Sequence, residues 1–315
     1  KHFMKILVTG SKGVVGKLLV EKLKQNNHSV MGCDLLHHPG QTGFSQVMSN
    51  EPLEYIRCDI SLYRQIERII LNNGPFDIIY NCAAEFGRWN GEDFFEQLWS
   101  SNVVGLKNLL LLQTLSPFKL VHFSSSEVYG DFNELMKESV MDDFEIKQMN
   151  DYAISKWTNE MQIRNHEMMY NSENVIVRLF NTYGPGETYH PYRSVNAKFC
   201  YHAINNLPIN LYRGHYRSST YIVDCVDALI NISKNFIKGR TYNIASTNYH
   251  DIETIADIVW SYTGASRDLI NYKDTEVLTT VNKKADNKLS VEELNFKDSL
   301  SLEEGIKKTI DWMKQ

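Results

Sequence analysis

The sequence predicts an α/β protein in which a doubly wound parallel sheet is followed by a smaller mixed α/β lobe. Two observations lead to this fold class. In the first 181 residues, short apolar runs alternate regularly with stretches of helical periodicity, and this alternation is typical of crossover units and a parallel sheet covered on both faces. After Thr182 the alternation weakens and prolines interrupt it.

The elements expected in the first part follow one another in order. The apolar run at residues 5–8 ends in a glycine-rich turn, and the residues after it have helical spacing. Strands are predicted at residues 5–8, 30–34, 54–58, 76–81, 119–124 and 175–180, and helices at 14–24, 62–71, 94–115 and 152–169. Such sheets bind ligands beyond the carboxyl ends of their strands, so the residues at those ends are the candidate site.

The second part is less regular. Pro185, Pro191 and Pro208 break its pattern, and aromatic residues interleave with polar ones. A strand–helix unit is predicted at residues 221–237, and amphipathic helices at 251–263 and 302–314. We therefore expect residues 1–181, joined by 217–240, to form the sheet domain. Residues 182–216 and 241–315 are expected to form a ligand-binding lobe.

Composition excludes several classes of function. The net charge of −5 argues against non-specific nucleic-acid binding, which needs basic surface. The five cysteines are odd in number and lack CxxC spacing, so neither a disulfide framework nor a metal site is expected. No apolar run approaches the roughly 18 residues that span a bilayer, and the first strand begins too early for a signal peptide. We expect a cytoplasmic protein without a membrane partner.

The glycine-rich turn has the pattern of a phosphate-binding loop. Gly10 permits a tight turn, Gly13 allows the backbone to approach a pyrophosphate, and Gly16 permits close packing of helix on sheet. Val14 and Val15 then open the helix, whose amide groups favour phosphate. A lone glycine motif is often a mere turn, but its place between the first strand and helix predicts a Rossmann-type dinucleotide site.

Acidic residues end the next two strands. Asp34 follows Gly16 by 18 residues, where a carboxylate can accept both ribose hydroxyls and repel a 2′-phosphate. This favours NAD over NADP, although a strand-end Asp can also be merely solvated. Asp59 and Ile60 end the third strand, and Asp59 could meet the adenine amino group.

Small side chains end the fourth strand. Cys82, Ala83 and Ala84 follow Asn81, and small residues let a flat cofactor lie on the backbone. Tight packing alone would explain the same pattern equally well.

The strongest candidates for catalysis are Tyr152 and Lys156. They share one face of a helix because they are four residues apart. The ammonium should lower the pKa of the phenol toward working pH, and a phenolate is a competent base for an alcohol proton. Ser125, after the fifth strand, can hydrogen-bond the same oxygen. Glu127 lies close by in sequence and is useful as a second base, for a proton that a neighbouring ketone has made acidic.

Two polar residues farther along suit a diphosphate. Asn181 ends the sixth strand and Arg217 precedes a YIVD run; an arginine can bind phosphate through its bidentate fork. As isolated residues, a turn Asn and a surface Arg would need no ligand.

Together these motifs resemble the extended short-chain dehydrogenase/reductase family, and within it the nucleotide-sugar epimerase/dehydratase branch. The resemblance runs from Met4 to the C-terminus. It is carried by TGSKGVVG, NCAA, NVVGLKNLL, SSSEVYG, YAISK, RLFNTYGP and ADNKLSVEELNF.

The resemblance implies a role for each candidate. Ser125, Tyr152 and Lys156 would be the catalytic triad, and Asn102 would orient the cofactor side of the lysine. Ser126, Asn181 and Arg217 would contact a nucleotide-diphosphate sugar, held by the smaller lobe. The resemblance also implies a homodimer through a bundle of the helices at 94–115 and 152–169.

The Ser-Ser-Glu triplet resembles the Thr-Ser-Glu of GDP-mannose 4,6-dehydratases and UDP-glucuronate decarboxylases. We therefore expect a 4,6-dehydratase that works through a 4-keto intermediate, with a 4-epimerase and then a decarboxylase as alternatives. No Asp precedes the Glu, unlike in dTDP-glucose 4,6-dehydratases. The usual diphosphate-binding Arg upstream of Asp286 is replaced by a region containing Thr279, Thr280, Lys283 and Lys284. A non-enzymatic NAD-sensing protein on this fold is less compatible with a chain that keeps both Tyr and Lys, and a steroid-type dehydrogenase would not need Asn181 and Arg217.

Overall fold

A seven-stranded parallel sheet forms the centre of the protein in the computed structural model, which describes residues 3–36 and 54–315. The strand order is β12-β7-β5-β4-β1-β2-β3. The strands are β1 (Lys5–Thr9), β2 (Ser29–Asp34), β3 (Tyr55–Arg57), β4 (Ile78–Asn81), β5 (Lys119–Ser125), β7 (Asn174–Leu179) and β12 (Thr241–Ile244). The order reverses between β1 and β4, which is where a doubly wound sheet opens a ligand crevice. The predicted fold class is confirmed.

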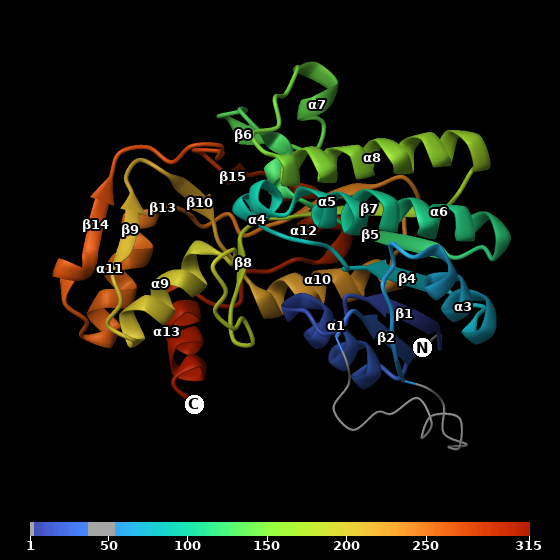
Figure 1. Ribbon diagram of the computed structural model, residues 1–315, viewed down its shortest axis with the longest axis horizontal. Coiled ribbons are helices and arrows are strands. Elements are labelled where there is room, and N and C mark those ends of the chain that lie inside the picture. The colour runs from blue at the N-terminus through green and yellow to red at the C-terminus, as the bar shows by residue number, and fades with distance from the viewer. Residues whose placement is uncertain (1–2, 37–53) are drawn as a thin grey trace.

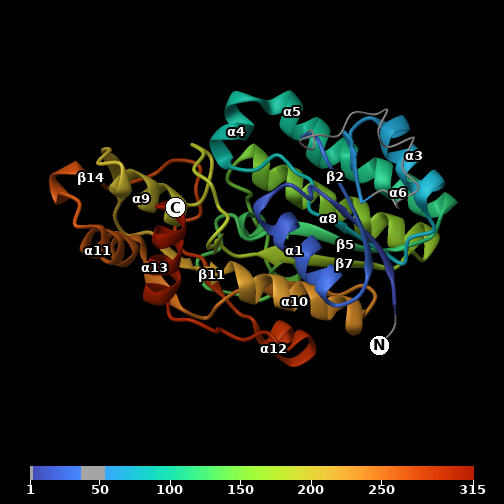
Figure 2. The same cartoon turned by 90° about the horizontal axis from the view of Figure 1, so that it is seen from below.

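Helices cover both faces of this sheet. On one face pack α1 (Val14–Gln25), α10 (Ile222–Lys234) and α12 (Lys288–Leu294), and on the other α3 (Tyr63–Asn73), α6 (Gly105–Leu115) and α8 (Asp151–Tyr170) (Figure 2). Each face has its own apolar core, one including Leu19, Val226 and Leu229 and the other Ile66, Leu109 and Ile163. The strands are buried on both sides and therefore read as continuous apolar runs.

The smaller lobe lies beside the carboxyl edge of the sheet (Figure 1). Its core joins α9 (Val195–Ile204), α11 (Ile252–Thr263) and α13 (Leu302–Met313), with Phe199 packed edge-on against Trp260. Short strands pair around it: β9 (Ile209–Tyr212) with β14 (Ile270–Lys273), and β10 (Tyr216–Ser218) with β13 (Tyr249–Asp251). The remaining short elements are α4 (Arg88–Asp93), α5 (Phe95–Trp99), the 3₁₀ turn Ser126–Tyr129, β6 (Leu135–Met136), α7 (Val140–Asp143), β8 (Thr182–Tyr183), β11 (Thr220–Tyr221), the 3₁₀ turn Arg267–Leu269 and β15 (Lys284–Ala285), besides the π-helical turn Ser100–Val104.

The return of the chain to the sheet differs from the prediction. The strand before α10 is only β11, which pairs with β8 outside the large sheet. The strand that joins the sheet is β12, after the helix, paired with β7. Residues 241–244 and the α12 segment, which the predicted boundary assigned to the smaller lobe, therefore pack with the large sheet.

The predicted long helix at residues 94–115 is interrupted. Between α5 and α6 the chain forms a π-helical turn, η1 (Ser100–Val104), which contains Asn102. Single π-turns inside helices are often found at functional sites. Among residues 3–36 and 54–315, no helix is both long enough and apolar enough to cross a bilayer.

Candidate active site

A cavity of about 600 Å³ runs along the carboxyl ends of the central strands. It brings together most of the residues predicted for the cofactor and for catalysis. Those lining it are Gly10, Gly13, Val14, Val15, Gly16, Asp34, Asp59, Ile60, Cys82, Ala83, Ala84, Ser125, Ser126, Glu127, Tyr152, Lys156 and Asn181. We call this cavity the cofactor cleft.

The glycine turn is shaped for a phosphate group. Gly10 has a φ of 65°, and a Cβ there would come within 2.7 Å of the Ala83 amide nitrogen. A Cβ on Gly16 would collide with the Gly10 carbonyl oxygen. Within the described chain, no side chain caps the first turn of α1, and Val14 and Val15 of that turn line the cleft. Free amides at a helix N-terminus fit the pyrophosphate of a dinucleotide.

The two strand-end carboxylates have different surroundings. Asp34 accepts hydrogen bonds from the backbone amides of Lys12, at 2.9 Å, and Leu36, at 3.3 Å, which fixes its carboxylate at the mouth of the cleft. Asp59 accepts from the amide and hydroxyl of Ser61 at 2.9 and 2.6 Å. The Asp59 carboxylate therefore also organises the turn that leads into α3.

Asn102 is buried in the π-turn and does not line the cofactor cleft. Its amide nitrogen donates to the Ser155 hydroxyl at 3.0 Å and to the Glu85 carbonyl at 3.0 Å. Its oxygen accepts from the Glu85 amide at 2.8 Å. Asn102 thus ties Ser155, the residue next to Lys156, to the Glu85 segment that borders the cleft.

Ser125, Tyr152 and Lys156 meet at the inner end of the cleft. Asn150 caps α8 by accepting from the Ala153 amide at 2.8 Å, which starts the helix just before Tyr152. Tyr152 is hydrogen-bonded to Ser125. The Lys156 Nζ lies 5.9 Å from the centre of the Tyr152 ring and donates to the Phe123 carbonyl at 2.8 Å. The predicted triad residues are therefore neighbours.

The protonation of this group differs from the prediction. Burial raises the pKa of Tyr152 to about 12, opposed by the hydrogen bond to Ser125. Burial also lowers the pKa of Lys156 to about 8, with Cys82 and Glu160 acting in the opposite direction. The expectation of a lowered Tyr152 pKa is wrong, because the loss of hydration raises the pKa by more than the hydrogen bond to Ser125 lowers it.

Glu127 lies at the inner end of the cleft, ion-paired with Lys283. Burial opposes ionisation of the carboxyl, but the positive charges of Lys283, Arg217 and Arg88 outweigh it and lower the pKa of Glu127. Glu127 is therefore a carboxylate at neutral pH. In the sequence, Lys283 is identified only as lying in the region where related proteins usually have an Arg. Its local pattern does not predict a contact with Glu127, which is 156 residues away.

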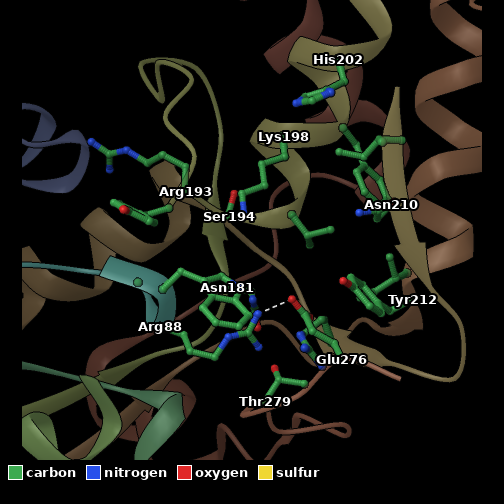
Figure 3. A pocket seen from close by; sticks show the side chains of 18 of the residues that line it. Arg88, Asn181, Arg193, Ser194, Lys198, His202, Asn210, Tyr212, Glu276 and Thr279 are labelled. Carbon is green, nitrogen blue, oxygen red and sulfur yellow. Dashed lines mark hydrogen bonds and ion pairs between the residues drawn. The ribbon is translucent and has the colours of Figure 1, made fainter. Parts of the chain in front are cut away.

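A second cavity of about 470 Å³, the substrate cavity, adjoins the cofactor cleft. Glu127, Asn181 and Lys283 line both. Arg217 lines only the substrate cavity, where its guanidinium donates to the carbonyls of Tyr216 and Val281 at 2.8 and 2.9 Å. Figure 3 shows the inner wall, with Arg88 ion-paired to Glu276 below Asn181, and Lys198 opposite. Sequence reasoning missed three of these residues: Arg88 on the short helix α4, Lys198 on α9, and Glu276 on a loop.

A buried ion pair lies behind the catalytic residues. The Glu160 carboxylate receives two hydrogen bonds from Arg178, at 2.7 and 3.0 Å, and one from the Ser124 hydroxyl at 2.6 Å. Arg178 also donates to the Tyr129 hydroxyl at 2.9 Å. Since Ser124 precedes Ser125 and Glu160 lies one turn beyond Lys156, this pair links the strand and the helix that carry the triad.

Comparisons with known proteins give the family. Residues 6–245 match the model of the NAD dependent epimerase/dehydratase family. The chain is 26% identical to the UDP-N-acetyl-alpha-D-glucosaminuronate decarboxylase of Bacillus cytotoxicus, over 98% of this chain and 97% of that one. It is 24% identical to the dTDP-glucose 4,6-dehydratase of Neisseria meningitidis serogroup B, over 98% and 92% of the two chains.

Solved structures agree on the fold. The UDP-glucose 4-epimerase of Thermotoga maritima, solved with UDP-glucose, matches with a TM-score of 0.86 and 22% identity, over 99% of both chains. The similar proteins thus include a decarboxylase, a dehydratase and an epimerase, each named for a nucleotide sugar.

Proposed function

Because the chain belongs to the NAD-dependent epimerase/dehydratase family, we propose that it is a nucleotide-sugar 4,6-dehydratase acting through a transient 4-keto intermediate. One observation carries this choice: Glu127 lines both cavities, where the cofactor cleft meets the substrate cavity. Oxidation of one carbinol does not need a carboxylate there. A carboxylate is useful as the base that takes the C5 proton once a ketone at C4 has acidified it.

The triad performs the first step. Tyr152 takes the proton of the C4 hydroxyl while Ser125 holds the same oxygen. Lys156 holds Tyr152 and the nicotinamide ribose. NAD, held by the glycine turn, Asp34 and Lys156, would supply the acceptor for the C4 hydride and the donor of a hydride to C6. Because the pKa of Tyr152 is about 12, the phenol first has to lose its own proton to solvent. Ser125 and the Lys156 ammonium have to stabilise the resulting phenolate before it can take the C4 proton.

The substrate cavity would hold the nucleotide-diphosphate sugar. Asn181 and Arg217 are the proposed ligands of the diphosphate, with Ser126 beside the sugar. Lys198 adds positive charge on the opposite wall (Figure 3). Among the described residues, nothing accepts or donates a hydrogen bond at the buried Asn181 Oδ1, which leaves that atom available to a ligand.

The proposal is tested with Glu127→Gln. This variant should still form reduced nicotinamide with substrate, because the triad is intact, but should not release water. Glu134→Gln, an exposed carboxylate on the loop that follows, is the matched control and should dehydrate like the wild type. A thermal-shift panel of UDP, dTDP, GDP and CDP with NAD first selects the nucleotide, since a bound ligand stabilises the fold. Dehydration by Glu127→Gln at the wild-type rate would overturn the proposal.

A decarboxylase is the second candidate, supported by the similarity to a glucosaminuronate decarboxylase over nearly the whole chain. It shares the first oxidation, but the C6 carboxylate would then leave as carbon dioxide. A 4-epimerase would instead reduce the ketone on its other face. The product distinguishes the three, because dehydration loses water, decarboxylation loses carbon dioxide, and epimerisation keeps the mass.

We also propose that two chains associate through α6 and α8. Ile154, Met161 and Met168 are exposed and recur every seven residues along α8. Val104 and Leu111, also exposed and seven residues apart, continue the apolar stripe at the η1–α6 boundary. Apolar side chains at this spacing form the seam of a helix bundle, and a second copy of the chain would bury both stripes.

A further inference from the structure

Lys283 is the cation that faces Glu127, and the backbone holds it rigidly in place. Its amide nitrogen donates to the Tyr216 carbonyl at 3.1 Å, next to Arg217. The residues after it form β15, which pairs with β6. Its side chain is 4% exposed and lines both cavities. A buried lysine fixed at the junction of two cavities is placed to touch a reacting sugar.

We propose that Lys283 is the acid of the dehydration: it protonates the departing C6 hydroxyl while Glu127 takes the C5 proton. The inference rests on the proposed 4,6-dehydratase function and adds a catalytic residue to it. Elimination of water needs a base and an acid near one another, and the residue before Glu127 is Ser126, which cannot serve as the acid at neutral pH.

The step balances without a further reactant. The C5–H bond breaks and its proton goes to the Glu127 carboxylate. The electron pair left on C5 forms the C5=C6 double bond. The C6–O bond breaks, and the oxygen takes a proton from the Lys283 ammonium and leaves as water. No atom is oxidised or reduced by the protein in this step, and Lys283 regains its proton from solvent.

The ion pair couples the two proton transfers. While Glu127 is ionised, its charge stabilises the Lys283 ammonium. Once Glu127 has gained the C5 proton, it no longer carries the negative charge that stabilises the Lys283 ammonium. The ammonium is then buried near the positive charges of Arg217 and Arg88. Burial already lowers the pKa of Lys283, and both arginines lower it further. Protonation of one partner therefore promotes release of a proton by the other, as in other coupled pairs.

Glu187 is the competing acid, since burial raises its pKa to about 7 and it lines the cofactor cleft. However, the Ser194 hydroxyl donates to its carboxylate at 3.1 Å, and Ser194 caps the first turn of α9. Glu187 therefore stabilises the start of α9. A carboxyl group cannot form an ion pair with Glu127, so Glu187 lacks the coupling described above.

Lys283→Arg is the decisive variant, because arginine keeps the positive charge but does not give up a proton in proteins. With nucleotide hexose and NAD in deuterated water, it should form reduced nicotinamide and exchange the C5 hydrogen as the wild type does. Release of water should fall at least about 100-fold, the usual loss for a general acid. Thermal shift with NAD confirms that the variant is folded, and Lys283→Gln serves the same comparison if arginine does not fit.

Three results would overturn the inference. The first is dehydration by Lys283→Arg at the wild-type rate. The second is loss of oxidation and exchange together with dehydration in Lys283→Arg. The third is loss of elimination alone in Glu187→Gln. Failure of the proposed function gives a distinguishable result, because the wild type itself would then form no dehydrated product. In that case the proposed role of Lys283 would also be wrong.

Discussion

Burial, rather than the lysine beside it, sets the protonation of Tyr152. The spacing of Tyr152 and Lys156 on one helix face, and their position after Ser125, could be predicted from the sequence. The direction of the pKa shift could not, because it depends on the hydration that each group loses in the folded chain. Lys283 could not be predicted either, since its contact with Glu127 joins segments far apart in sequence.

The depressed pKa of Lys156 leads to a stability prediction. The pKa falls from 10.5 to about 8 on folding, so the buried charge costs stability below about pH 8, and this cost disappears as the pH rises toward 10.5. Lys156→Met should therefore raise the free energy of unfolding at pH 7 by on the order of 3 kcal/mol, while abolishing turnover. Urea unfolding at pH 7 and pH 10 measures this, and the gain should shrink at pH 10.

The control for this prediction is Lys17→Met, which replaces an exposed lysine and should change stability little at either pH. If Lys156→Met were less stable than the wild type at pH 7, burial of the charged lysine would not be destabilising, and the prediction would be wrong.

The secondary structure of the first half could be predicted in order, because each strand is a short apolar run and each helix has clear periodicity. Several elements could not, including the π-turn η1 in the first half and the strand–helix unit at residues 220–223 in the second. A π-turn such as η1 leaves the apolar pattern of its helix unchanged. At residues 220–223 a short apolar run can start either a buried strand or a helix, and here it starts α10, so the strand of that unit is β12.

The Glu160–Arg178 pair is a testable contact between elements. Both side chains are buried, at 3% and 4% exposure, so Glu160→Gln leaves Arg178 without a buried counter-charge and should cost about 3 kcal/mol. Replacing both, as Glu160→Gln with Arg178→Met, removes the unpaired charge and should recover part of that loss. Chemical denaturation of the single and double variants measures it.

Glu303→Gln breaks the exposed pair between Glu303 and Lys307 on α13 and serves as the control, with an expected change below about 1 kcal/mol. If the double variant at Glu160 and Arg178 lost as much as the two single changes added together, the pair would not act as a coupled unit.

Association of two chains is the prediction for the whole molecule. The apolar stripes of α6 and α8 should bring the purified protein to the mass of a dimer in light scattering. Met161→Glu together with Ile154→Glu places charges on the stripe of α8 and should give a monomer. Val291→Glu, on α12 at the opposite face of the sheet, should remain dimeric. A wild-type protein that is monomeric at micromolar concentration would contradict this part of the account.

The arrangement of the whole chain explains why the same oxidation at C4 can lead to dehydration, decarboxylation or epimerisation. The sheet supplies the cofactor cleft and the triad, while the smaller lobe and the segments around Arg88 and Lys283 supply the substrate cavity. The first set could be predicted from motifs, because glycine turns and strand ends recur with fixed spacing. The second set lies on loops, short strands and the helices α4 and α9, whose contacts with one another depend on the folded chain.

The mass of the product tests the central claim most directly. The wild-type protein is incubated with NAD and a hexose linked to the nucleotide that the thermal-shift panel selects. The mass of the product is then measured by mass spectrometry. The account predicts a product lighter than the substrate by one water, with no net accumulation of reduced nicotinamide. A product of unchanged mass, or one that has lost carbon dioxide from the corresponding uronate, would contradict it.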